Sequence, residues 1–146
     1  MANTAVGANA LFSNTTGIGN TAMGDFALFA NTTAQSNTAT GAQALFNNTT
    51  GGFNTANGEL ALVNNTIGEA NTATRRSGLG ANTTGNNNTA DGLDALFNNT
   101  TGNDNTAVGN IALFSNTSGS NNVAFGSEAG ENQQPVRTTS ISAREC

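Results

Sequence analysis

The sequence predicts an all-β chain, a parallel β-solenoid in which each 17-residue repeat forms one coil. Asparagine returns every seventeen residues from Asn3 to Asn122, without insertion or deletion. Each asparagine opens a copy of one unit, roughly N-T-A-x-G-x-x-A-L-F-x-N-T-T-G-x-x. Within the unit the apolar residues keep fixed places. A period this strict indicates one small structural unit stacked on itself.

Seven complete copies occupy residues 3–121, and a shortened eighth copy occupies 122–130. We number the copies as coils 1 to 8, and we call the set of residues at one position of the unit a row, so that Asn3 begins row 1. Residues 3–130 are expected to form the solenoid. Residues 131–146 are expected to form a tail that acts as a cap, a linker or an inter-subunit contact.

Two short strands per copy are expected, one around N-T-A-x and one around L-F-x-N-T, with tight glycine turns between them. A helical repeat is disfavoured because Gly, Asn and Thr are poor helix formers. The segment between the strands, such as residues 8–11, could alternatively form one helical turn. Glycine in rows 5 and 15 is expected to supply the positive φ that sharp corners need.

Stacking turns each row into a ladder of like side chains at a spacing of about 4.8 Å. An inward asparagine ladder satisfies itself, because each amide donates to one neighbouring copy and accepts from the other. Asparagine followed by threonine, as in rows 12 and 13, can also close a turn through its side chain. The structural asparagine ladder is predicted to be Asn3, Asn20, Asn37, Asn54, Asn71, Asn88, Asn105 and Asn122, and the core leucine ladder to be Leu11, Leu28, Leu45, Leu62, Leu79, Leu96 and Leu113.

The phenylalanines of row 10 pose a separate problem. Left in water, five rings would form an apolar stripe larger than a soluble monomer usually exposes. They either pack inside a larger coil or form a seam between chains, in a parallel homotrimer or a bundled filament. The seam is the favoured interpretation, and its residues are Phe12, Phe29, Phe46, Phe97 and Phe114.

Coil 5 departs from the pattern, because Arg75-Arg76 interrupts the glycine corner and Gly80 replaces phenylalanine. This is either drift at an exposed corner or a local contact site for an acidic ligand. The net charge of -5 argues against nucleic acid as a partner. The single cysteine, Cys146, cannot form an internal disulfide and is either an incidental thiol or an intermolecular tether.

The repeated unit resembles the short tandem repeats of phage tail-fibre-like and bacterial surface proteins. The segments N-T-A-V-G (3–7) and N-N-V-A-F-G-S-E-A-G (121–130) are also similar to the head repeats of trimeric autotransporter adhesins. The resemblance covers residues 3–130. It implies a left-handed β-roll, commonly trimeric, displayed on a cell surface or a virion fibre.

No catalytic, cofactor or metal site can be assembled from the sequence, so the chain is not expected to be an enzyme. There is no histidine to serve as a base. Of the acids Asp25, Glu59, Asp91, Asp94 and Asp104, only Asp25 and Glu59 share a row. Calcium is not expected, because Gly51-Gly52 is not followed by a calcium-binding repeat. The N-x-[ST] sequons at Asn14, Asn31, Asn48, Asn82, Asn99 and Asn116 are read as a turn requirement rather than as glycosylation sites.

The leading hypothesis is therefore a non-enzymatic extracellular stalk, fibre or adhesin segment that associates with itself. No run of residues is apolar enough to cross a membrane. A self-assembling filament, joined end to end through open strand edges, is the alternative. Ice binding and glycan binding are lesser alternatives. Thr15 and Thr16 are adjacent and should face opposite ways, so the N-T-T segment does not make the flat T-x-T array expected of an ice binder.

Overall fold

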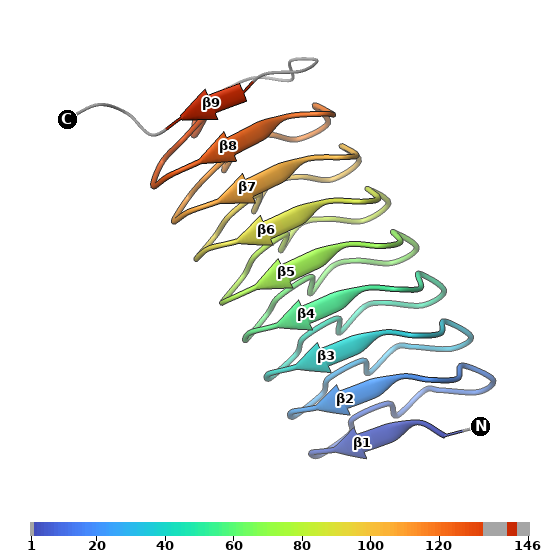
Figure 1. The fold of residues 1–146 in the computed structure, drawn as a ribbon. Helices are drawn as coiled ribbons and strands as arrows, with labels where there is room; N and C mark the ends of the chain where they lie inside the picture. Colours follow the sequence, from blue (N-terminus) through green and yellow to red (C-terminus); the bar gives the residue numbers. More distant parts are fainter. Residues whose placement is uncertain (1, 133–139, 143–146) are drawn as a thin grey trace.

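The computed structural model describes the backbone of residues 2–132 and 140–142 and the side chains of residues 2–132. It confirms the predicted parallel β-solenoid, with one strand per 17-residue repeat and no helix in the part of the chain that is described (Figure 1). The strands are β1 (Thr4–Val6), β2 (Thr21–Met23), β3 (Thr38–Thr40), β4 (Thr55–Asn57), β5 (Thr72–Thr74), β6 (Thr89–Asp91), β7 (Thr106–Val108), β8 (Val123–Phe125) and β9 (Ser140–Ser142).

The strands form one parallel sheet in chain order, and each pairs with the same row of the next coil. Thr38 pairs with Thr55 and Ala39 pairs with Ala56, for example. Strand β9, which comes from the predicted tail, pairs with β8 one repeat length away, with Val123 opposite Ser140. From β1 to β7 threonine lies over threonine, and from β1 to β8 alanine lies over alanine.

Only the N-T-A-x segment forms a strand, and the prediction of a second strand around L-F-x-N-T is wrong. The leucines of row 9 have φ values from 51° to 54°, in the left-handed region, so the chain cannot stay extended there. The segment instead forms tight turns, such as the one closed by Asn31 N donating to Leu28 O at 3.2 Å. It still bonds to the next coil: Leu28 N donates to Ala44 O and Ala30 N donates to Phe46 O.

The two glycine rows meet different demands. Six glycines of row 5 have φ between 118° and 155°, as predicted. The glycines of row 15 do not have positive φ, so that part of the prediction is wrong. Their row is tight for another reason: a Cβ on Gly85 would overlap Gly102 O and the side-chain oxygen of Asn82.

The core is a narrow column of small and branched apolar side chains. The alanines of rows 3 and 8 and the leucines of row 9 are fully buried from coil 2 to coil 7, as at Ala56, Ala61 and Leu62. Leu11, in coil 1, is only partly buried, because none of the described coils lies on its other side. These side chains form one continuous hydrophobic core along the rod.

Candidate functional surfaces

The row 1 asparagines lie inside the rod and tie each coil to the next. Asn37 is fully buried; its side-chain oxygen accepts from Asn54 N at 2.9 Å, and its Nδ2 donates to Gly51 O in its own coil at 2.9 Å. The amide-to-amide bond expected for this row occurs only from Asn71 onward, where Asn71 Nδ2 lies 3.2 Å from Asn54 Oδ1. Elsewhere the partners are backbone groups. At the open end, Asn3 is exposed.

The row 12 asparagines form the more continuous amide ladder, which the sequence interpretation treated only as turn closers. Asn65 Nδ2 donates to Asn48 Oδ1 at 2.8 Å and to Gly68 O at 2.9 Å, while Asn65 Oδ1 accepts from Asn82 Nδ2 at 2.7 Å. Every buried side-chain nitrogen and oxygen in the described residues has a partner. The strict recurrence of Asn in row 12 was the available signal for this ladder.

The same contacts bear on the sequons. From Asn31 to Asn116 the row 12 side chains are buried, and the amide nitrogen that would carry a glycan already makes two hydrogen bonds, as at Asn48. A folded coil therefore offers no room for glycosylation there. The neighbouring row 13 hydroxyls are also used, since Thr32 Oγ1 donates to Thr49 O at 3.1 Å.

The row 10 phenylalanines lie on the outside of the rod, so the alternative that they pack inside a larger coil is wrong. Phe12, Phe29 and Phe46 stack with ring centroids 5.3 and 5.1 Å apart and nearly parallel planes. Phe26, from row 7, packs its tilted ring against Phe29 and Phe46. We call these four residues the N-terminal aromatic cluster. Phe12, in the end coil, is 67% exposed, and the other three are half-buried.

A second, smaller aromatic pair lies further along the rod. Phe97 and Phe114 stack at 5.6 Å, and Val63 and Gly80 separate them from the N-terminal aromatic cluster. The ring of Phe97 covers Gly80, because a Cβ there would lie 2.8 Å from Phe97 Cε2. The five predicted seam residues therefore share one side of the rod in two groups rather than in one unbroken stripe.

The two arginines of coil 5 project outward and face acids of neighbouring coils. Arg75 Nε lies 3.9 Å from Asp91 Oδ1, and Arg76 Nε lies 3.7 Å from Glu59 Oε2. All four side chains are largely exposed, so each pair adds little stability. Because the guanidinium groups already face carboxylates, they attract an acidic ligand less than two unpaired cations would.

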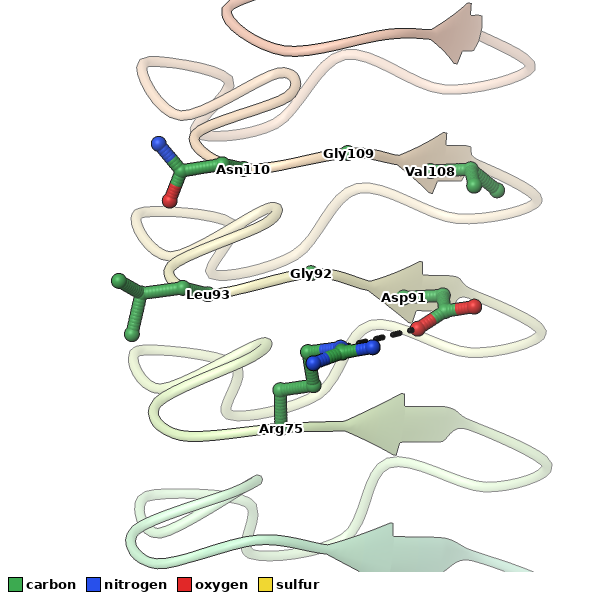
Figure 2. A pocket seen from close by; sticks show the side chains of 7 residues that line it. All are labelled: Arg75, Asp91, Gly92, Leu93, Val108, Gly109 and Asn110. Atoms are coloured by element: carbon green, nitrogen blue, oxygen red, sulfur yellow. Dashed lines mark ion pairs between the residues drawn. The ribbon is translucent and has the colours of Figure 1, made fainter.

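A surface depression of about 400 Å³ lies beside Arg75 (Figure 2). It forms because Gly92 and Gly109 have no side chains, and Leu93, Val108 and Asn110 border it. Asp91 Oδ1, at its edge, accepts a hydrogen bond from Thr74 Oγ1. The lining of the depression therefore combines two glycines, two aliphatic side chains, one amide and one exposed ion pair.

The acids elsewhere are similarly dispersed. Asp25 and Glu59 share row 6 but lie two coils apart. Among the residues whose placement is described, no three acidic, histidine or cysteine side chains come together in a way that could hold a metal ion. Those same residues include no helix of the length and apolar character that a bilayer span requires. Cys146 lies outside the described residues.

Comparison of the chain with protein-family models, with curated proteins and with solved structures yields no match.

Proposed function

We propose that the chain is a non-enzymatic structural segment of an extracellular stalk or fibre, in which the solenoid acts as a stiff spacer. One observation carries the proposal. From coil 1 to coil 7, each coil is joined to the next by the same backbone bonds, by the row 1 and row 12 asparagines and by the row 13 threonines. Eight strands at about 4.8 Å give a rod roughly 34 Å long. The extracellular location rests on the resemblance, and the non-enzymatic role rests on the sequence, which offers no histidine to serve as a base.

Self-association through the side of the rod that carries the phenylalanine rings is part of this proposal. The N-terminal aromatic cluster and the Phe97–Phe114 pair present rings on one side of the rod, and burying a phenylalanine is worth about 1.5–3 kcal/mol. In a parallel homotrimer each coil faces its equivalent, so rings of one chain meet the same rings of the next. Cyclic symmetry of this kind closes the assembly.

Replacing Phe12, Phe29, Phe97 and Phe114 together by serine should dissociate the oligomer into single chains. Light scattering after size-exclusion chromatography measures the mass. The matched control is the pair Phe53→Ser and Ile67→Ser, which removes exposed apolar side chains from other rows and should leave the mass unchanged. An unmutated chain that already has the mass of one copy would contradict the seam.

A self-assembling filament is a second candidate, and the open edge at β1 favours it. All three residues of β1 are exposed, whereas Ala22, directly above Ala5, is fully buried. Thr4 N and Val6 O both bond toward coil 2, so by alternation the N–H and C=O of Ala5 point away from it. A free parallel edge of this kind can accept the last strand of another copy.

Negative-stain electron microscopy separates the two candidates. The stalk proposal predicts discrete short rods, and the filament proposal predicts long fibres. Ala5→Pro removes an N–H that makes no hydrogen bond to residues 2–132, so it should shorten fibres without unfolding the coils. Fibres that persist in Ala5→Pro would argue against end-to-end growth through β1, and amorphous particles would argue against both candidates.

A further inference from the structure

The outer face of the sheet carries a regular row of threonines. In each strand from β2 to β8 the central alanine is fully buried, so the residues on either side of it point outward. In the first seven strands the residue before the alanine is threonine, and the strand register aligns these residues in one column. We call this column the strand threonines: Thr4, Thr21, Thr38, Thr55, Thr72, Thr89 and Thr106.

The hydroxyls of the strand threonines are free, unlike those of the turn threonines. In row 13 the hydroxyls form hydrogen bonds to the backbone of the next coil, since Thr49 Oγ1 donates to Thr66 O and Thr83 Oγ1 donates to Thr100 O. No strand threonine hydroxyl makes a hydrogen bond to another group within residues 2–132. Their donors and acceptors, together with their methyl groups, are left for whatever covers the face.

A second rank of side chains completes the face at its centre. Thr40, Asn57 and Thr74 follow the alanines of β3, β4 and β5 and lie in register beside the strand threonines. The T-A-T strands thus provide the outward T-x-T pairs that the N-T-T segments lack. The structure corrects the sequence-based expectation here, because the pairs lie in the strands and not in the turns.

The face is also nearly uncharged. Among the outward residues of β1 to β8 only Asp91 carries a charge, although the whole chain has a net charge of -5. The strands keep similar directions along the rod, so the sheet has little twist (Figure 1). A flat neutral array suits a flat neutral lattice better than it suits a charged ligand.

We propose that the strand threonines and their second rank form an ice-binding surface. Hydroxyl and methyl groups recur here at the strand spacing of about 4.8 Å, close to the interval at which water oxygens repeat on hexagonal ice. The rigid ladders beneath hold this array without an ordering cost on binding, which is the advantage of a preorganised surface. The proposal is independent of the stalk function, which needs no ligand on this face.

Thermal hysteresis and ice-crystal shape at millimolar protein test the proposal. The unmutated chain should depress the freezing point below the melting point and produce faceted crystals. The double variant Thr55→Tyr with Thr72→Tyr places two protruding rings at the centre of the face and should abolish both effects. The control, Thr50→Tyr with Thr84→Tyr, changes exposed threonines of row 14 outside the sheet and should retain them.

Circular dichroism and the melting temperature establish that each variant is folded. If the tyrosine pair fails to fold, Thr38→Lys provides a second protrusion on the same face with the same expected loss. Round crystals and no hysteresis from the unmutated chain would overturn the proposal. So would equal loss in the row 14 control, or binding to crystalline chitin or cellulose without any effect on ice.

Discussion

Replacing Asn65 by aspartate should destabilise the rod by about 3 kcal/mol or more near neutral pH. Asn65 is fully buried, and its Nδ2 makes two hydrogen bonds, to Asn48 Oδ1 and to Gly68 O. A carboxylate has the same shape but cannot donate, so it would bring three acceptors together and bury a charge. Urea unfolding followed by circular dichroism measures the loss.

The effect of Asn65→Asp should also depend on pH. Burial among acceptors raises the pKa of the introduced carboxyl in the folded chain above its unfolded value of about 3.9. The penalty is therefore smallest well below about pH 4, where both states are protonated. It grows as the pH rises from the unfolded pKa to the raised folded pKa and is constant above that.

The matched control is Asn110→Asp, which adds the same charge at an exposed position and should change the unfolding free energy by less than about 0.5 kcal/mol. A pH-independent loss in Asn65→Asp, or an equal loss in both variants, would show that row 12 is not a buried ladder.

Replacing Leu62 by alanine should cost about 2–5 kcal/mol, because it opens a cavity in the middle of the leucine column. Leu62 is fully buried between Leu45 and Leu79. The left-handed backbone at Leu62 strains alanine as much as leucine, so the loss reports on packing rather than on φ. Thermal unfolding gives the size of the effect, and hydrogen exchange should place the faster opening in coils 3 to 5.

Leu93→Ala removes the same atoms from a side chain that is 42% exposed and should be nearly neutral. Equal destabilisation by Leu62→Ala and Leu93→Ala would mean that the leucine row does not form the interior.

Much of the fold follows from the sequence because a fixed period translates directly into a fixed register. Once Asn20 is known to lie over Asn3, the stacking of Ala22 on Ala5 follows without any knowledge of the chain path. The burial of the leucine row could be predicted for a similar reason. It is the row that keeps a large apolar side chain in all seven complete copies, and a thin rod has room for few such side chains.

The path of the chain within a coil could not be predicted in the same way. Leucine rarely adopts the left-handed conformation, so nothing local to Leu45 or Leu62 indicates a φ of 53°. The closure of the coil and its bonds to both neighbours impose that value. The same closure turns the expected second strand into turns and leaves Gly85, in row 15, no space for a side chain.

For the candidate surfaces, too, the sequence predicts which rows matter but not the contacts that their residues make. The row 1 asparagines were predicted as a ladder, and those of row 12 only as turn closers. Which atoms bond depends on distances that only the folded coil fixes, as at Asn37 and Asn65. The break at Gly80 was visible in the sequence, whereas the position of the Phe97 ring over it was not. The sequence alone also could not show that the hydroxyl of Thr83 makes a hydrogen bond within the rod while that of Thr55 does not.

The rise per repeat along the rod tests the central claim most directly. Fibre diffraction from aligned protein, or a cryo-electron microscopy map of the oligomer, should show a strong axial repeat of about 4.8 Å, one for each seventeen residues. A map without that repeat, or with two strand spacings for every seventeen residues, would contradict a chain that completes one circuit per repeat.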